Sequence, residues 1–325
     1  MNMFRHMRID VACAIALAGA AACSVSTAQT YPSRPIRLLI PFAPSGGTDI
    51  LARMVAQSLS ETLGQQMVAD NRPAVDGLVA SETLVRSAPD GYTLLLISSS
   101  HAINPAIGRK LPYDTLRDFA PITQTASQQM FLVVHPSLPV KSVKELIDYA
   151  KAKPDSLNYG SSSSATALPM ELFNAMAGIK TTHIPYRGSA PMLNDLLGGQ
   201  INLSIAAAVS ALPHIKSGRL RVLAIGDAKR STILPDLPTI AEAGVPGYQA
   251  VIWSGLLAPS KTPRAIIDKL YKDTSRIVLA AEFKERLVQL GSDAVGSTPE
   301  QWGAFIKSEI EKWGKIAKIA GVKAE

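Results

Sequence analysis

Cysteine is almost absent from this chain of 325 residues: only Cys13 and Cys23 occur, and both lie near the N-terminus. The segment around them has the features of a cleavable leader. A mature chain without thiols has no disulfide, no cysteine ligand for a metal and no cysteine nucleophile. Thiol redox chemistry and cysteine catalysis are therefore excluded.

The N-terminal segment predicts export. The residues MNMFRHMR carry two arginines and precede the apolar run VACAIALAGAAAC, which is shorter than the roughly 20 residues that span a bilayer. Ser26 and Ala28 then form the small-x-small pattern that signal peptidase accepts. We expect residues 1–28 to be a signal peptide that directs the protein to the periplasm. Lipidation at Cys23 is the alternative, but Ala20 stands where a lipobox usually has Leu.

Long apolar runs and dense basic clusters are also missing. After residue 30, charges, prolines or glycines interrupt every apolar stretch before it reaches membrane-spanning length. The formal net charge of +7 favours anionic partners only weakly. Lysines and arginines are scattered, and no basic cluster alternates with stacking aromatics. We therefore expect no nucleic-acid partner.

Motifs for catalysis, metals and cofactors are missing as well. There is no G-x-S-x-G elbow, no H-E-x-x-H and no Cys/His metal spacing. The glycine pair at Gly46 and Gly47 has neither the lysine of a P-loop nor a G-x-G-x-x-G fingerprint. We predict no catalytic residue, no metal and no cofactor, so the protein is not an enzyme. The enzymatic alternative is a periplasmic hydrolase built from distant residues, which would lose turnover on Ser164→Ala.

The chain alternates between strands and helices, as is typical of α/β folds. In the first third, IRLLIPF, QQMVADN and YTLLLIS have the pattern of strands, and DILARMVAQSLSETL and GLVASETLVRSA that of amphipathic helices. This βαβαβ order predicts a parallel sheet. Thr48 or Asp49 is expected to cap the first helix.

A second block of the same kind begins near Met130. Its expected strands are FLVVHP, LNYGSSSS, TTHIPYRG, INLSIAAA and LRVLAIG, and a further apolar strand, VIWSGLLAPS, precedes the final helices. A mature chain of roughly 300 residues is long for one hydrophobic core. We predict an α/β protein with two lobes joined by two strands: residues 29–126 and 248–325 form lobe 1, and residues 127–247 form lobe 2.

Candidate binding residues lie where strands end, because ligands of open α/β sheets bind beyond the carboxyl ends of the strands. Residues 41–49 place two glycines before a helix whose free amides favour an anion. In residues 160–166, hydroxyls and amides can hold a carboxylate without a countercharge. Serines in residues 97–101 can line the opposite wall, and Arg187 beside Tyr186 can contact a carboxylate with both arms of its guanidinium.

Structural roles compete with each of these interpretations. The glycines can serve chain reversal alone, and the serine loop can be a solvated helix cap. Arg187 can belong to a surface salt bridge. A lone histidine such as His101 is more often structural, and Trp253 is expected in the core rather than against an aromatic ligand.

Several stretches, in a fixed order, extend along nearly the whole mature chain. They are YPSRPIRLLIPFAPSGGTDILAR, PDGYTLLLISSSHAINPAI, LPYDTLRDFAPIT, YGSSSSATALPMELF, HIPYRGSAPMLNDLLGGQI, SGRLRVLAI, LPDLPTIAEAGVPGYQA and SGLLAPSKTP. Together they resemble the Bug-type solute-binding proteins of tripartite tricarboxylate transporters. The resemblance implies a two-lobed Venus flytrap, the type II-like periplasmic-binding-protein fold, with the ligand cleft between the lobes.

The resemblance also implies a function and a set of contacts. The ligand is expected to be a small organic carboxylate, such as a dicarboxylate, a tricarboxylate, an aromatic carboxylate or an acidic amino acid, delivered to membrane permease subunits. A membrane sensor kinase is the alternative partner. The implied ligand-binding residues are Ala43, Ser45, Gly46, Gly47, Thr48, Asp49, Ser98 and Ser99 in lobe 1, and Ser161, Ser163, Ser164, Thr166, Tyr186 and Arg187 in lobe 2.

The chain departs from the family pattern in three places. Ser45 replaces a usual glycine, and Asn202 stands where an aspartate is common. The segment NRPAVDG at residues 71–77 lacks the usual small Gly-Ala-Gly-Gly run. Val75 and Asp76 therefore add bulk and negative charge, which either reshape the cleft or lie on the surface.

Overall fold

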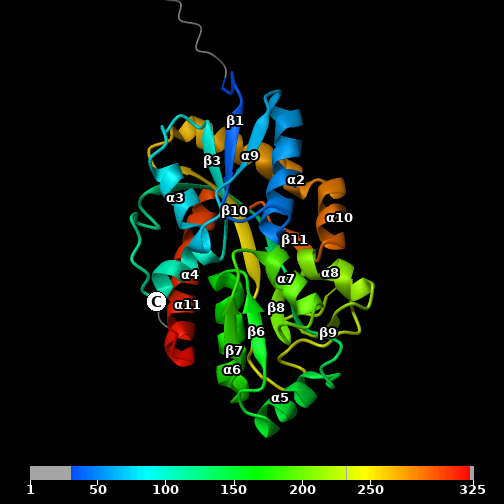
Figure 1. Cartoon of the computed structure of the whole chain (residues 1–325). Coiled ribbons are helices and arrows are strands. Elements are labelled where there is room, and N and C mark those ends of the chain that lie inside the picture. Colours follow the sequence, from blue (N-terminus) through cyan, green and yellow to red (C-terminus); the bar gives the residue numbers. More distant parts are fainter. Residues whose placement is uncertain (1–30, 232, 323–325) are drawn as a thin grey trace, which may run out of the picture. The chain divides into compact units, whose positions relative to one another are not determined.

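The computed structural model describes residues 31–231 and 233–322. The predicted signal peptide and the alternative of lipidation at Cys23 lie outside these residues. From Arg34 onward the chain folds around two β-sheets, one of six and one of five strands (Figure 1). No helix in the described part combines the length and the apolar character that a membrane span needs.

The first sheet has the strand order β11-β4-β10-β3-β1-β2. Its strands are β1 (Ile36–Ile40), β2 (Met67–Asn71), β3 (Thr93–Ser98), β4 (Phe119–Gln128), β10 (Ile252–Pro259) and β11 (Ser292–Ala294). β1 pairs in parallel with β2 and β3, as predicted, but β10 and β4 join antiparallel. The predicted parallel arrangement of the first three strands is therefore confirmed, and two antiparallel strands extend the same sheet, because β10 starts at the end of the sheet where β1 and β3 finish.

The second sheet has the strand order β7-β6-β8-β5-β9. Its strands are β5 (Met130–Val134), β6 (Asn158–Ser161), β7 (Thr182–Pro185), β8 (Leu203–Ala207) and β9 (Arg221–Ile225). β6 pairs in parallel with β7 and β8, whereas β5 runs antiparallel to β8 and β9. The carboxyl ends of β6 and β8 consequently lie at one edge of this sheet.

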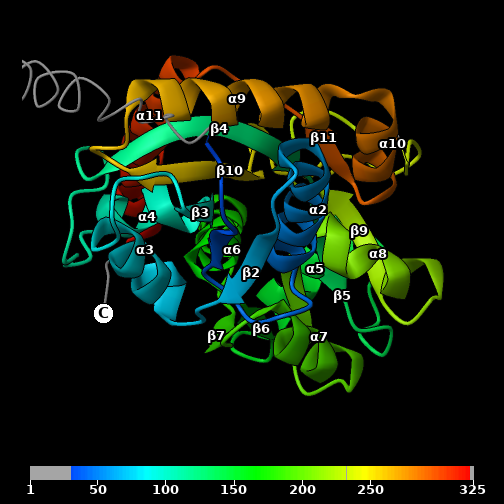
Figure 2. The same ribbon diagram turned by 90° about the horizontal axis from the view of Figure 1, so that it is seen from above.

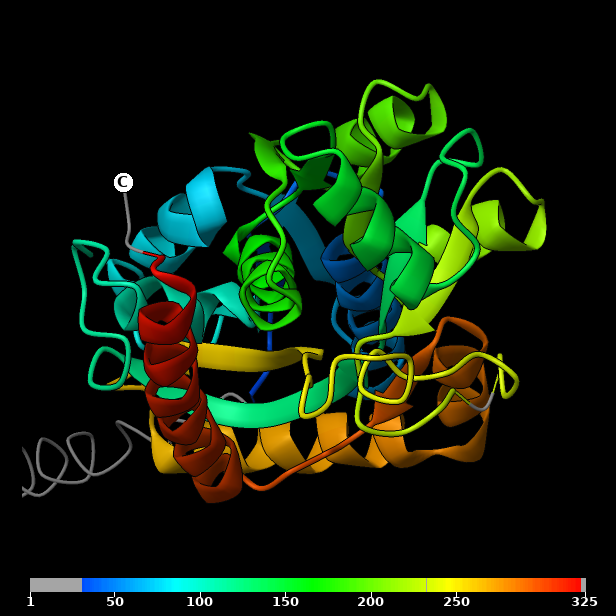
Figure 3. The ribbon, with the colours of Figure 1, turned by 90° about the horizontal axis from the view of Figure 1, so that it is seen from below.

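Helices cover both sheets. They are α2 (Gly47–Leu63), α3 (Leu78–Val85), α4 (Ser100–Ala106), α5 (Val143–Ala152), α6 (Ser164–Ala177), α7 (Ser189–Leu197), α8 (Ala208–Lys216), α9 (Arg264–Leu279), α10 (Ala281–Gln289) and α11 (Pro299–Ala320). Figure 2 shows α9 lying along β4 on the outside of the first sheet. The long helix α11 contacts α4 and β4, and it also contacts α6 beside the second sheet (Figure 3).

Local sequence explains where several helices begin and end. α2 buries Leu51, Val55 and Leu59 on one face, as its helical spacing predicts, and it ends at Gly64 with a left-handed φ of 65°. α5 begins after Ser142, whose side chain accepts a hydrogen bond from the backbone N–H of Glu145.

The chain passes from the first sheet to the second at Gln129, which separates β4 from β5, and it returns between β9 and β10. Backbone hydrogen bonds hold both crossings: the N–H of Gln129 donates to the carbonyl of Gly291, and the N–H of Gly226 donates to the carbonyl of Met130. One apolar cluster around Trp302 packs on the first sheet, and two others pack on the faces of the second.

Candidate ligand-binding site

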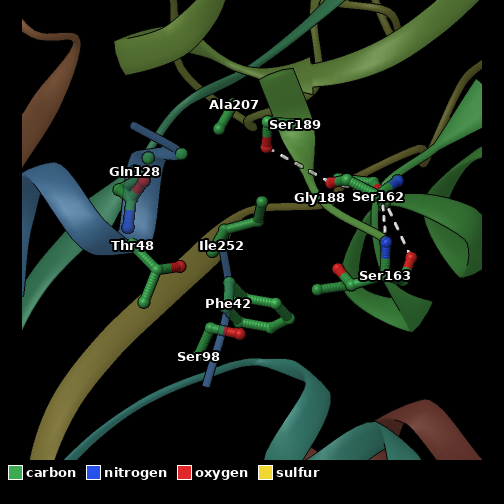
Figure 4. Close-up of a pocket in the computed structure, with 14 residues that line it drawn as sticks. Phe42, Thr48, Ser98, Gln128, Ser162, Ser163, Gly188, Ser189, Ala207 and Ile252 are labelled. Carbon is green, nitrogen blue, oxygen red and sulfur yellow. Dashed lines mark hydrogen bonds between the residues drawn. The ribbon is translucent and has the colours of Figure 1, made fainter. Parts of the chain in front are cut away.

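A small cavity lies where strands of both sheets end. About 30 Å3 of it is open to the centre of a water molecule. The lining comes from the segment after β1, from the ends of β3, β4 and β8, from the loops before α6 and α7, and from the start of β10 (Figure 4). The lining residues are Phe42, Gly46, Gly47, Thr48, Ser98, Gln128, Ser162, Ser163, Ala165, Thr166, Gly188, Ser189, Ala207 and Ile252.

The N-terminus of α2 faces this cavity without a side-chain cap. Its N-cap residue is Gly46, and no side chain accepts a hydrogen bond there. Within the described residues, the backbone N–H groups of Gly46, Gly47 and Thr48 have no recorded acceptor. Because the first amides of a 17-residue helix carry partial positive charge, this wall of the cavity attracts anions.

Asp49 stabilises the loop before α2. Its carboxylate accepts hydrogen bonds from the backbone N–H of Ser45 (2.9 Å), from Arg53 and from Asn71. Burial acts to raise the pKa of Asp49, but the hydrogen bonds from Arg53 and Asn71 outweigh it and hold the pKa below its usual value. The expectation that Thr48 or Asp49 caps α2 is therefore wrong: both lie inside the helix, and Asp49 fixes the conformation of Ser45, whose φ is 67°.

Gln128 supplies a buried donor to the same cavity. It is the last residue of β4, only 1% of it is exposed, and its Nε2 has no hydrogen-bond partner within the described residues. Figure 4 shows its side chain beside Thr48. An unpaired buried amide is costly, so this group is available to a ligand oxygen.

Several backbone N–H groups in the loop before α6 donate hydrogen bonds to side chains of the protein itself. Thr166 Oγ1 accepts hydrogen bonds from the backbone N–H groups of Ser162 (2.9 Å) and Ser163 (3.2 Å). The next N–H group, that of Ser164, donates to the carboxylate of Asp76 at 2.6 Å. Ser162 also accepts a hydrogen bond from the hydroxyl of Ser189 (3.4 Å, Figure 4).

The structure brings some of the sequence-predicted site residues to the cavity and leaves others outside its lining. Those that line it are Gly46, Gly47, Thr48, Ser98, Ser163 and Thr166. Those that do not are Ala43, Ser45, Asp49, Ser99, Ser161, Ser164, Tyr186 and Arg187. Several of the second group support the lining: Ser99 Oγ accepts a hydrogen bond from the backbone N–H of Trp253.

Tyr186 and Arg187 differ in their surroundings. The hydroxyl of Tyr186 donates to Asp195 at 2.7 Å, and burial together with this bond raises the pKa of Tyr186 to about 12. Arg187 is exposed and directly precedes Gly188, which lines the cavity. Its guanidinium therefore lies in solvent next to the site.

Sequence reasoning missed further lining residues, chiefly Gln128, Ser189, Ala207 and Ile252. Ala207 and Ile252 are apolar residues at strand ends, and only the position of those ends could have signalled them. Ser189 could have been predicted, because it follows a glycine after a predicted strand and begins α7. Gln128 gave no such signal, since β4 was not predicted.

One serine and histidine pair bears on the hydrolase alternative. Ser161 Oγ lies 2.7 Å from His183 Nε2, and His183 stacks on Tyr159. Ser161 is only 3% exposed and does not line the cavity. The pair joins β6 to the neighbouring strand β7, where His183 is exposed. In the described ranges, no three His, Cys, Asp or Glu side chains are grouped to hold a metal.

A family model matches most of the chain. Residues 51–322 match the model described as "Tripartite tricarboxylate transporter family receptor". The chain belongs to this family. The resemblance inferred from the sequence is thereby confirmed, and the family is one of binding receptors rather than of enzymes.

A curated relative supports the same assignment over the full length. BugT of Bordetella pertussis is 37% identical over 327 residues, which cover 99% of this chain and 99% of the relative.

Solved structures confirm the expected two-lobed α/β fold of periplasmic solute-binding proteins. A protein of R. palustris solved with adipate is 39% identical, with a TM-score of 0.89 over 90% of this chain and 99% of the other. The periplasmic binding protein BugD is 32% identical, with a TM-score of 0.87 over 91% and 100%. MatC from Rhodopseudomonas palustris, solved with bound malate, is 30% identical, with a TM-score of 0.82 over 88% and 99%.

Proposed function

We propose that the protein is an exported solute-binding receptor that captures a small organic carboxylate and presents it to the membrane subunits of a tripartite tricarboxylate transporter. The observation that carries this proposal is the uncapped N-terminus of α2, whose free amides line the cavity together with Thr48 and the buried amide of Gln128. These groups donate hydrogen bonds to an anion without a countercharge. Ligands named for two related structures, adipate and malate, are carboxylates.

Capture proceeds by closure of two lobes. We assign residues 29–126 and 248–325 to lobe 1 and residues 127–247 to lobe 2, with residues 1–28 removed on export to the periplasm. A cavity with about 30 Å3 open to the centre of a water molecule has little room for a ligand of several carbon atoms, so the ligand enters when the lobes move apart at the crossings near Gln129 and Gly226. A ligand that then contacts both lobes favours the closed form by its differential affinity, and the membrane subunits recognise that form.

The test is a thermal-shift screen of the mature chain against dicarboxylates, tricarboxylates, aromatic carboxylates, acidic amino acids and neutral sugars. A ligand present at 100 times its dissociation constant stabilises the folded state by about 2.7 kcal/mol, so we expect a rise of several degrees in Tm with a carboxylate and none with sugars. A shift produced only by a neutral or cationic compound contradicts the proposal.

Thr48→Val tests the α2 end of the site. Valine has a similar volume but lacks the hydroxyl, so we expect roughly tenfold weaker binding of the best carboxylate by calorimetry, as for the loss of one hydrogen bond to a charged group. Thr83→Val is the matched control, because the Thr83 hydroxyl donates to the carbonyl of Val79 on α3 and Thr83 does not line the cavity. Equal affinities of the two variants would remove Thr48 from the site.

A further inference from the structure

The carboxylate of Asp76 joins two parts of the chain that we assign to different lobes. Asp76 lies in the 3-10 turn Val75–Gly77 of lobe 1, and its Oδ1 accepts a hydrogen bond from the backbone N–H of Ser164 in lobe 2 at 2.6 Å. Among the described residues, this is the only side-chain hydrogen bond recorded between residues up to 126 and residues 127–247. It involves neither of the two crossings of the chain.

Lobe 1 holds the Asp76 side chain in place. Arg109 Nη2 lies 3.1 Å from its Oδ2, and Asn104 Nδ2 donates to its backbone carbonyl at 3.1 Å. Asn104 is fully buried in α4, and the side chains of Asp76 and Arg109 are 7% and 20% exposed. Because all three residues belong to lobe 1, the carboxylate keeps its position and its counter-ion when the lobes move apart.

Ser164 presents the N-terminus of α6 to this carboxylate. It is the first residue of a 14-residue helix, so its N–H has no acceptor within the helix. A carboxylate at this end is stabilised by the hydrogen bond and by the partial positive charge of the first amides. Movement of lobe 2 away from lobe 1 would separate the two groups, and water would replace each partner. The hydrogen bond therefore belongs to the closed form alone.

We propose that Asp76 is a positioning residue for ligand capture, which favours the closed form by bonding to the N-terminus of α6 without touching the ligand. This inference rests on the proposed function, because it concerns the lobe closure by which that site works. Asp76 does not line the cavity, and Arg109 balances its charge. Its effect is therefore on the equilibrium between the open and closed forms, and not on the recognition of a particular ligand.

The same hydrogen bond should strengthen the binding of every ligand by one factor. The apparent affinity of a ligand that needs the closed form is reduced in proportion to the fraction of protein in that form. Loss of the bond lowers this fraction by a factor that does not depend on the ligand. A hydrogen bond to a charged group corresponds to a factor of about ten or more in such an equilibrium. A residue that contacts the ligand would instead affect different ligands unequally.

Two substitutions remove the two sides of the bond with little strain. The φ of Asp76 is 51°, a left-handed conformation that glycine adopts freely, so Asp76→Gly removes the carboxylate and preserves the turn. Ser164→Pro removes the N–H, and proline suits the first position of a helix. Ser163 already has the extended backbone that a residue before proline favours. Ser164→Ala is the matched reference, because it also lacks the hydroxyl but keeps the N–H.

The experiment measures calorimetric dissociation constants for adipate, malate and the strongest carboxylate of the thermal-shift screen. We expect Asp76→Gly to weaken each of those that bind by the same factor, about tenfold. In the Ser164→Ala protein, Asp76→Gly should cause the same loss. In the Ser164→Pro protein, where the N–H is already absent, Asp76→Gly should change the affinity by less than about threefold, since coupled residues do not have additive effects.

The outcomes separate this inference from the proposed function. A loss below about threefold on Asp76→Gly, a gain of affinity, or losses that differ by more than about threefold between ligands overturn the role of Asp76 and leave carboxylate capture intact. An effect of Asp76→Gly as large in the Ser164→Pro protein as in the Ser164→Ala protein also overturns it, because Asp76 would then act without the Ser164 N–H. If no carboxylate of the screen binds the folded protein, the proposed function fails and the inference fails with it.

Discussion

His101 is a buried histidine beside the site, and its environment makes folding depend on pH. It packs edge-on against Phe119 with ring centroids 4.8 Å apart, and it is 4% exposed. Burial lowers the pKa of His101 to about 4. The backbone of Thr115 approaches the ring and opposes this shift, but neither ring nitrogen has a partner with hydrogen-bond geometry in the described residues.

The consequence is a loss of stability in mild acid. In the unfolded chain the His101 pKa is near 6.5, so between pH 6.5 and about 4 the unfolded state binds a proton that the folded state excludes. The contribution of His101 is fully present above pH 6.5 and falls by up to about 3 kcal/mol as the pH drops to 4. Urea unfolding at pH 7 and pH 4.5 should show a weaker pH dependence for His101→Leu than for the wild-type protein.

At the scale of single residues, the sequence predicted part of the lining of the cavity but not every contact. Gly46, Gly47 and Thr48 could be predicted because glycines after a strand and before a helix expose free amides. The contacts of Asp76 could not be predicted, because its partners Arg109 and Ser164 are distant in sequence. A charge in a loop looks the same whether it is solvated or buried between lobes.

Glu309 attaches α11 to both halves of the molecule. Its Oε2 accepts hydrogen bonds from the indole N–H groups of Trp253 (2.8 Å) and Trp313 (2.9 Å), and Lys312 lies 3.2 Å from its Oε1. Trp253 belongs to the apolar cluster on the first sheet, whereas Trp313 belongs to a cluster on the second. One carboxylate on one helix therefore connects two cores.

Replacement of Glu309 should destabilise the protein. Glu309→Leu leaves two buried indole N–H groups unpaired, and we expect a loss of about 2–4 kcal/mol in the free energy of unfolding. Glu309→Gln keeps an amide oxygen as acceptor and should cost less. Urea denaturation of the two variants measures the difference. If the leucine variant is as stable as the glutamine variant, the hydrogen bonds to the tryptophans do not hold α11.

Elements with apolar periodicity were predictable, and polar buried elements were not. The helical pattern of α2 and the apolar strands β1, β3 and β5 match the structure closely. β4, with the sequence FAPITQTASQ, is also mostly buried, yet it carries buried polar residues, two of which donate hydrogen bonds to backbone carbonyls. Thr125 Oγ1 donates to the carbonyl of Ser254, and Thr123 Oγ1 donates to that of Ser297. Hydrophobic periodicity cannot detect such a strand.

At the scale of the whole molecule, Gly47 permits the two halves to meet. A Cβ at Gly47 would lie 2.6 Å from Val209 Cγ1 on α8, whereas a Cβ at Gly46 would meet nothing nearer than 3.5 Å. Real Cβ atoms do not approach as closely as 2.6 Å, so a methyl group at position 47 separates α2 from α8. Closure around a ligand needs this approach.

Gly47→Ala should therefore weaken carboxylate binding at least about tenfold while leaving the fold intact, because the two lobes fold around separate sheets. Gly314→Ala on α11, where a Cβ would meet nothing nearer than 3.8 Å, is the control and should bind as wild type. Adding Val209→Ala to Gly47→Ala removes the clashing methyl group and should restore much of the affinity, as calorimetry with the best ligand can measure. Absence of rescue by the double variant contradicts the steric explanation.

The three tryptophans of the chain, Trp253, Trp302 and Trp313, are all fully buried, and Trp253 directly follows Ile252, which lines the cavity. Intrinsic fluorescence therefore arises from one interior region that joins β10 and α11. In the folded protein this emission should be blue-shifted and poorly quenched by acrylamide. A change in the emission on titration with a ligand would report rearrangement at the start of β10. Tryptophan fluorescence would thus report, without any added label, the lobe closure that we propose.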